Sequence, residues 1–269
     1  MERIIFNWMV PRSLTTVFMR SIEARGDFKT VFEPFLPLYW SKRANEKGVS
    51  HKDYDGWPTD YDGIKNKIFE MARKEPLFIK ECALHAADKL VEDKEILGNC
   101  FHMFQIRHPK RCVLSSWKLR GTQKRQLADS GFDASYKIFK RLSELNLQPL
   151  ENGKTPLVID GDDFQDDPEG IMMAWCDAVG IEFKPKAMNW KPEWRKEYDH
   201  WETCYYDVAK SSCVQKNMEA FLYDELLHKA IFEDLPLLKV CYEYHMPFYE
   251  KMYKYRLQPK KASNLSVLK

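Results

Sequence analysis

The N-terminal stretch from Ile4 to Ile22 constrains the fold more than any other part of the sequence. It begins with an apolar run suited to a buried strand and ends with apolar residues at helical spacing. The short join between them, from Pro11 to Thr16, carries one arginine and three hydroxyl side chains. A strand, a tight turn and a helix N-terminus present backbone N–H groups and the positive end of a helix dipole to an anion. The stretch therefore predicts an anion-binding turn.

A simpler interpretation is that this turn is an ordinary helix start in an α/β domain, with Thr15 or Thr16 capping the helix. The turn also lacks the glycines and the Gly-Lys-Ser/Thr ending of a nucleoside-triphosphate P-loop. The turn alone is therefore only moderately specific for anion binding.

Four more segments have the character of strands, and helical patterns separate them. Such alternation predicts parallel strands joined by right-handed crossovers, with ligands at the carboxyl ends of the strands. We therefore expect one α/β domain over residues 1–269, P-loop-like, with a central parallel sheet of about five strands flanked by helices. The four segments are residues 28–32, 76–79, 101–106 and 155–159.

Three regions stand outside this alternation. Residues 35–63 are polar and irregular, which predicts a mobile lid or a short helical insertion. Residues 186–256 are predicted to form a helical, aromatic-rich C-terminal part, and residues 257–269 a polar tail. Aromatic residues recur every three or four positions from Trp190 to Tyr205, which predicts one stripe of a single helix.

A second arginine follows the strand that ends at Ile106. Arg107 is followed by His108 and by Pro109, which suits the first position of a helix, and Ser115 lies two turns farther on. Two strand-to-helix turns that carry arginine at one edge of a sheet predict a ligand with two separate anionic groups. A solvated basic patch is the alternative, and it accounts poorly for an arginine directly at a strand end.

Titratable residues also gather at the end of the third predicted strand. Lys80 and Glu81 lie at its end, His85 follows a few positions later, and Glu33 belongs to the same edge of the sheet. Such a concentration is typical of a functional site. The alternative, an exposed ion pair beside a surface histidine, is equally compatible with the sequence.

The composition excludes several classes of protein. A formal net charge of +2 argues against a general nucleic-acid-binding surface, and no apolar stretch reaches the length of a membrane span. The seven cysteines are scattered and no signal-peptide pattern is visible, so we expect a cytoplasmic protein with free thiols. The aspartates of residues 160–169 resemble helix caps more than ligands, so no metal site is expected.

The two arginine turns together resemble those of the sulfotransferase family that uses 3′-phosphoadenosine 5′-phosphosulfate (PAPS). Pro11 to Thr16 is similar to the family's Pro-Lys/Arg-Ser-x-Thr-Thr turn. Arg107 with its Arg-x-Pro turn, and Ser115 eight positions later, match the family's second motif. Residues 157–181 resemble its acidic turn and following helix. The resemblance covers most of residues 1–185.

The resemblance implies PAPS as the donor and 3′-phosphoadenosine 5′-phosphate (PAP) as the product. Arg107 and Ser115 would hold the 3′-phosphate. The first turn, in which Leu14 stands where the family usually has glycine, would hold the 5′-phosphosulfate. The residues of that turn assigned to binding are Arg12, Ser13, Leu14, Thr15 and Thr16.

The resemblance implies transfer of a sulfuryl group to a hydroxyl or amine of a small-molecule acceptor, without nucleic acid or membrane as partner. Lys80 would assist, and Glu81 or His85 would be the base, with Glu81 favoured because it adjoins the strand end. Val17 stands in place of a tryptophan common in the drug-conjugating cytosolic branch, from which the chain diverges. A P-loop nucleotide phosphotransferase and a non-catalytic nucleotide-binding protein are the alternatives. The sequence does not reveal the acceptor or the oligomeric state.

Overall fold

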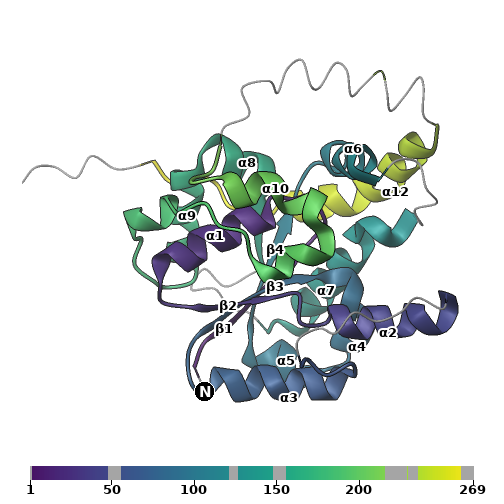
Figure 1. Ribbon diagram of the computed structural model, residues 1–269, viewed down its shortest axis with the longest axis horizontal. Helices are drawn as coiled ribbons and strands as arrows, with labels where there is room; N and C mark the ends of the chain where they lie inside the picture. Colours follow the sequence, from purple (N-terminus) through teal and green to yellow (C-terminus); the bar gives the residue numbers. More distant parts are fainter. Residues whose placement is uncertain are drawn as a thin grey trace, which may run out of the picture.

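The centre of the molecule is a five-stranded sheet in the order β2-β3-β1-β4-β5, in which every neighbouring pair of strands is parallel. A computed structural model describes residues 2–47, 56–120, 127–147, 156–215, 229 and 236–261. The predicted α/β fold with a parallel sheet of about five strands is confirmed (Figure 1). The strands are β1 (Ile4–Met9), β2 (Lys29–Phe32), β3 (Leu77–Cys82), β4 (Phe101–Ile106) and β5 (Leu157–Asp160).

Helices cover both faces of this sheet (Figure 1). The first of them, α1, connects β1 to β2 and lies on the same face as α8 and α9, whereas α3, α4, α5 and α7 lie on the other. The α-helices are α1 (Thr15–Arg25), α2 (Leu36–Lys47), α3 (Tyr61–Ala72), α4 (Ala83–Leu90), α5 (Lys94–Asn99), α6 (Pro109–Arg120), α7 (Phe132–Leu145), α8 (Gly161–Asp166), α9 (Pro168–Ala178), α10 (Glu202–Lys210) and α12 (Pro236–Tyr253). The described residues also form the 3₁₀-helices η1 (Leu127–Ser130), η2 (Pro185–Met188) and η3 (Lys196–Trp201).

The apolar core is divided between the two faces of the sheet, as the alternation of side chains along a strand requires. In β1, Ile5 packs in the cluster beneath α1 and α9, which contains Phe18 and Trp175. Its neighbours Phe6 and Trp8 pack in the opposite cluster. All six residues of β1 are buried, as is typical of a central strand of a parallel sheet. This burial fixes β1, and with it the turn that follows.

The aromatic stretch from Trp190 to Tyr205 is not one helix. The chain is irregular around Trp190, then forms η3 and then α10. Pro192 interrupts the helical pattern because it has no N–H and restricts the residue before it. The backbone N–H of Trp190 instead donates to the carbonyl of Ser212. The spacing of the aromatics was therefore misleading, although Tyr205 does lie on a helix.

Part of the polar region 35–63 is helical, since α2 begins at Leu36 and α3 begins at Tyr61. The predicted tail starts against the sheet rather than away from it. The backbone N–H of Leu257 donates to Val158 of β5, and that of Lys260 donates to Gly170. Residues 48–55, residues 216–228 and 230–235 of the predicted helical C-terminal part, and the last residues of the tail, 262–269, lie outside the described residues.

Two aspartates of the acidic run at residues 160–169, Asp160 and Asp167, are helix caps, in line with the prediction for this run. The carboxylate of Asp160 accepts hydrogen bonds from the backbone N–H groups of Asp162 and Asp163 at the start of α8. The carboxylate of Asp167 likewise accepts from Gly170 at the start of α9, 2.9 Å away. These contacts fix the direction in which α8 leaves the sheet, and α8 borders the site described below.

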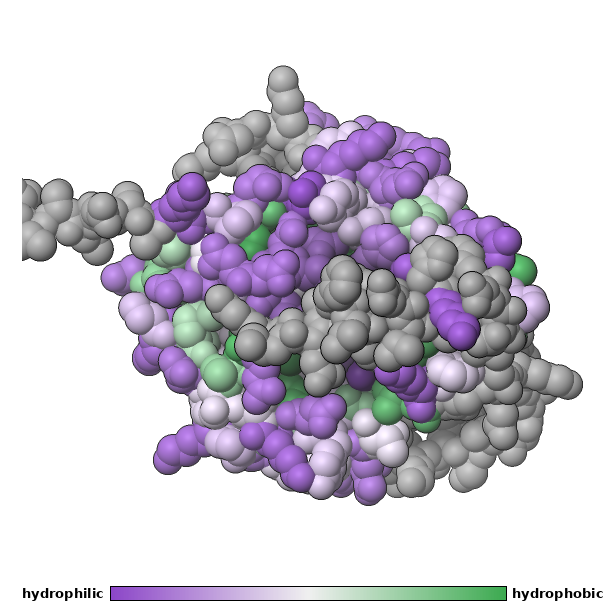
Figure 2. Space-filling model, turned by 90° about the horizontal axis from the view of Figure 1, so that it is seen from above, coloured by the Kyte–Doolittle hydropathy of each residue, from purple (hydrophilic) through white to green (hydrophobic). Residues whose placement is uncertain are grey.

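Hydrophilic residues dominate the face of the molecule seen in Figure 2, and hydrophobic residues appear there only in small separate places. Within the ranges that the structure describes, no helix combines the length and the apolar character needed to cross a bilayer.

Candidate functional site

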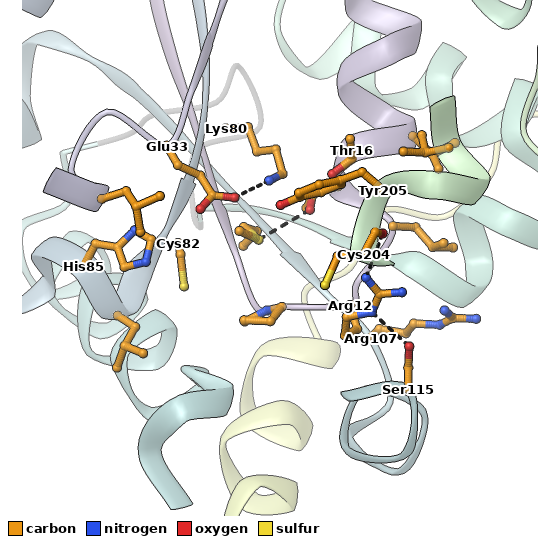
Figure 3. Close-up of a pocket in the computed structure, with 18 of the residues that line it drawn as sticks. Arg12, Thr16, Glu33, Lys80, Cys82, His85, Arg107, Ser115, Cys204 and Tyr205 are labelled. Carbon is orange, nitrogen blue, oxygen red and sulfur yellow. Dashed lines mark hydrogen bonds and ion pairs between the residues drawn. The ribbon is translucent and has the colours of Figure 1, made fainter. Parts of the chain in front are cut away.

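A cavity of about 390 Å³ opens at the carboxyl ends of the strands, between the β1–α1, β2–α2, β3–α4 and β4–α6 connections and helix α10 (Figure 3). Its volume is within the usual range for a small-molecule site. Two of the predicted site residues, Ser13 and Glu81, do not line it. The other eight do: Arg12, Leu14, Thr15, Thr16, Lys80, His85, Arg107 and Ser115.

The β1–α1 turn holds two residues in the left-handed region. Arg12 has φ 73° and Leu14 has φ 65°, a conformation that normally favours glycine. Leu14 thus keeps the backbone conformation expected of the glycine it replaces. It is also the N-cap of α1, without a side-chain cap, so Thr15 and Thr16 are the first helical residues rather than caps. The start of α1 therefore borders the cavity with its N–H groups uncapped by a side chain.

Buried hydrogen bonds of a hydroxyl and two side-chain amides support this turn. The hydroxyl of Ser13, which is fully buried, donates to the carbonyl of Val10 at 2.7 Å and shares its hydrogen with the carbonyl of Gln105 at 3.1 Å. The side-chain amide of Gln105 donates back to the carbonyl of Ser13 and accepts a hydrogen bond from Asn7, 2.9 Å away. Ser13 thus fixes the shape of the turn through its side chain, whereas the predicted role was contact with the ligand.

Gly161, at the start of α8, packs directly against the same turn. A Cβ at this position would lie 2.6 Å from the carbonyl oxygen of Ser13. We expect Gly161→Ala to destabilise the protein by about 1–3 kcal/mol and to displace the turn, because backbone atoms cannot yield as a flexible side chain would. Thermal unfolding measures the effect. Gly98→Ala is the matched control, since nothing lies within 4 Å of its Cβ, and equal melting temperatures of the two variants would contradict the expectation.

The second arginine is held between two side chains of α8. Arg107 Nε donates to Asp162 Oδ1 at 2.8 Å, and its Nη2 donates to Gln165 Oε1 at 3.0 Å. Arg111 lies 3.4 Å from the same carboxylate oxygen. Arg107 still lines the cavity, together with Gln165. Its guanidinium is thus preoriented at the edge of the cavity.

The two arginine turns meet in the cavity. Arg12 Nε donates to the hydroxyl of Ser115 on α6 at 2.9 Å, and Arg12 Nη1 donates to the carbonyl of Cys204 on α10 (Figure 3). A side chain of the first turn is therefore bonded to a residue of the second motif. The two predicted anion-binding turns therefore contact each other at this cavity.

Lys80 and Glu33 form a buried ion pair in the same cavity. Lys80 Nζ lies 2.5 Å from Glu33 Oε1, and the two side chains are 1% and 6% exposed. The ring of Phe32 lies 4.0 Å from the ammonium, and the Tyr205 hydroxyl also hydrogen-bonds Glu33. Burial raises the pKa of Glu33, but the charge of Lys80, the neighbouring His85 and the hydrogen bonds from Lys80 and Tyr205 together outweigh burial, so its pKa lies below the usual value. Glu33 is therefore a carboxylate.

Glu81 lies behind His85 rather than in the cavity. Its two oxygens accept the backbone N–H groups of Phe35 and Cys82, and Oε1 also lies 2.7 Å from His85 Nδ1. Burial raises the pKa of Glu81, and the neighbouring His85 only partly offsets that rise. His85 itself lines the cavity, with the ring of Tyr39 centred 4.8 Å from its own. Of these two residues, His85 is the one that can meet a ligand.

The structure adds functional candidates that the sequence analysis did not assign. Glu33 was placed on the correct edge of the sheet, but nothing in the sequence paired it with Lys80. Cys204 and Tyr205 enter the cavity from a helix more than 190 residues after Arg12, and the contact between Cys204 and Arg12 depends on tertiary packing alone. Asp162 was recognised only as part of an acidic run.

Comparisons with known proteins agree with this geometry. A family model of the sulfotransferase domain matches residues 3–254. The chain is 25% identical over 252 residues to branched-chain-amino-acid aminotransferase-like protein 2 of Arabidopsis thaliana, covering 90% of this chain and 42% of that protein. It is 24% identical to the corresponding protein 1, covering 78% of this chain and 36% of that protein. The chain thus spans less than half the length of these relatives.

A solved structure also resembles the whole chain. The sulfotransferase domain from the curacin biosynthetic pathway aligns with a TM-score of 0.53 and 17% identity, over 96% of this chain and 99% of that domain. This likeness concerns the fold. Because the family model extends over nearly the whole chain, from β1 to the end of α12, the protein belongs to the sulfotransferase domain family.

Proposed function

We propose that this protein transfers a sulfuryl group from PAPS to a hydroxyl or amine of a small-molecule acceptor. The observation that carries the proposal is the hydrogen bond between Arg12 and Ser115, which joins the two anion-binding turns within one cavity. A nucleotide with phosphate groups at both its 3′ and 5′ positions needs two such sites close together. A nucleoside triphosphate, with its phosphates in one chain, does not.

The residues present fit such a donor. Arg12, Thr15 and Thr16, with the N–H groups at the start of α1, would hold the 5′-phosphosulfate. Arg107 and Ser115 would hold the 3′-phosphate. PAPS supplies the sulfuryl group, whose sulfur leaves a 5′-phosphate oxygen as it bonds to the acceptor.

His85 is the proposed base. Both oxygens of Glu81 accept backbone N–H groups, so Glu81 acts as an acceptor and His85 Nδ1 donates to it. This arrangement fixes the tautomer and leaves a lone pair on Nε2, which can take the proton from the acceptor. Glu81 thereby becomes a positioning residue, whereas the sequence analysis favoured it as the base.

As the sulfuryl group is transferred, negative charge develops on the leaving 5′-phosphate oxygen. Stabilising this charge is the main electrostatic contribution to such a transfer. Arg12, Lys80 and the N-terminus of α1 all line the cavity and would stabilise that charge. Lys80 can do so because Glu33 keeps its ammonium in place within the protein interior.

A cytoplasmic location is also part of this proposal. All seven cysteines are free thiols, and five of them are buried. Free thiols are expected where the surroundings are reducing.

The direct test is incubation of the purified protein with PAPS and ATP together and a mixture of small alcohols, phenols and amines, with mass spectrometry of the products. We expect an acceptor that gains one sulfuryl group, together with one equivalent of PAP. Consumption of ATP instead of PAPS in the same mixture would overturn the proposal in favour of a phosphotransferase.

A further inference from the structure

We propose that Glu33 restricts the acceptor to molecules without a negative charge near the reacting group, namely uncharged or cationic alcohols and amines with an apolar body. This inference rests on the proposed function, because it assigns one end of the cavity to the acceptor. It concerns a residue to which the sequence motifs gave no role.

The backbone at Glu33 is strained in a way that marks it as functional. Its φ is 43°, a left-handed conformation unusual for glutamate. Among the described residues, four that are not glycine have positive φ, and three of them, Arg12, Leu14 and Glu33, line this cavity. Strained residues of this kind gather at functional sites, where the surrounding structure holds them.

Neighbouring backbone holds Glu33 in this conformation. Its N–H donates to the carbonyl of Lys80, and its own carbonyl accepts the N–H of Leu36 at the start of α2. Glu81 fixes the next part of the turn by accepting the N–H of Phe35 at 2.6 Å. The β2–α2 turn is thus built against the end of β3, and it directs the carboxylate of Glu33 into the cavity.

Glu33 lies between the proposed base and the proposed donor site. In Figure 3, His85 and Cys82 lie on one side of it, and Arg12, Arg107 and Ser115 lie at the opposite end of the cavity. Apolar and aromatic residues predominate in the wall beside His85, and the carboxylate of Asp129 also belongs to the cavity lining. The apolar and aromatic residues are Leu36, Tyr39, Trp40, Cys82 and Leu84.

The charges of the cavity are unevenly divided. Arg12 and Arg107 lie at the donor end, where the anionic groups of PAPS would use them. The remaining permanent cation of the described lining is Lys80, and Glu33 already matches it at 2.5 Å, while Asp129 and Asp207 add two further carboxylates. Glu33 and the anionic donor would both repel a carboxylate on the acceptor, and no unmatched cation of the described lining would offset that repulsion. An uncharged or cationic acceptor would not meet this repulsion.

The test uses sets of acceptors that share one body and differ in charge. One set is 4-ethylphenol, tyramine and 3-(4-hydroxyphenyl)propionate, and equivalent sets of aliphatic alcohols extend it. With PAPS as donor, we expect the carboxylated member to have a kcat/KM at least tenfold lower than its uncharged partner. Equal turnover of the two would overturn the inference. So would failure to modify any uncharged or cationic member by protein that binds PAP.

The variant Glu33→Gln shows whether this residue is the cause. We expect the ratio of kcat/KM for the carboxylated member to that for the uncharged member to rise at least tenfold, because Lys80 then lacks its counter-ion. Glu33→Asp keeps the charge and should keep the ratio, which separates charge from packing. An unchanged ratio in folded Glu33→Gln would refute the assignment. Calorimetry with PAP, on the wild-type protein and on the variant, checks the donor site separately. Failure of the folded wild-type protein to bind PAP would refute the proposed function instead.

Discussion

Replacing Arg107 with alanine is expected to weaken PAP binding by about 30- to 150-fold. A charge-assisted hydrogen bond at a partly buried site contributes about 2–3 kcal/mol, which corresponds to this change in affinity. Asp162 adds to the effect, because its carboxylate lies 2.8 Å from Arg107 Nε and would lose that counter-ion close to the 3′-phosphate. Isothermal titration calorimetry measures the loss.

Two comparisons make this prediction specific. Adenosine 5′-phosphate lacks the 3′-phosphate, so its affinity should change less than threefold in Arg107→Ala. Lys110→Ala is the matched control, since Lys110 is a cation three residues later, at the start of α6, and does not line the cavity. Equal losses for both nucleotides would mean that Arg107 supports the fold rather than the 3′-phosphate.

Replacing His85 with asparagine is expected to lower kcat by about 10²- to 10⁴-fold, the usual contribution of a general base. PAP affinity should stay within about threefold of wild type, because His85 lies at the opposite end of the cavity from Arg107 and Ser115 (Figure 3). The measurement is steady-state sulfuryl transfer at saturating PAPS, beside calorimetry with PAP.

His108→Asn serves as the control for this variant. His108 is a partly buried histidine that does not line the cavity, and its Nδ1 accepts the N–H of Lys110, a contact that asparagine can replace. Near-normal kcat in His85→Asn would move the role of base to another group. A parallel loss in His108→Asn would indicate a general effect on structure.

Local sequence patterns were sufficient to predict the sheet and the two arginine turns. A buried parallel strand leaves a continuous apolar run, and the residue after it is at a predictable edge of the sheet. Arg12, Lys80 and Arg107 could therefore be placed from the ends of their strands. The family resemblance then assigned chemistry to positions that pattern had already brought together.

Other features depended on tertiary packing. Ser13 matches the motif, yet its hydroxyl bonds Val10 and Gln105, because the turn folds back onto β4. Glu81 adjoins the strand end, but alternation along the strand directs it toward Phe35 and His85 rather than into the cavity. The aromatic stretch was misread because spacing alone carries no information on the break at Pro192.

The conformation of Leu14 could not be predicted from its side chain. A leucine in the left-handed region is unfavourable by about 1–2 kcal/mol, so local preference argues against the glycine-like turn. The buried supports from Asn7, Gln105 and Gly161 hold the turn in this shape nevertheless. The turn therefore has a glycine-like backbone conformation at a position that leucine occupies.

The central claim is that one cavity accepts a nucleotide through separate 3′ and 5′ anion sites. Calorimetry of the wild-type protein with PAP, adenosine 5′-phosphate, ADP and ATP, all without magnesium, tests this claim most directly. The account predicts clear preference for PAP over the other three. Preference for ATP, or equal binding of PAP and adenosine 5′-phosphate by the folded protein, would contradict it.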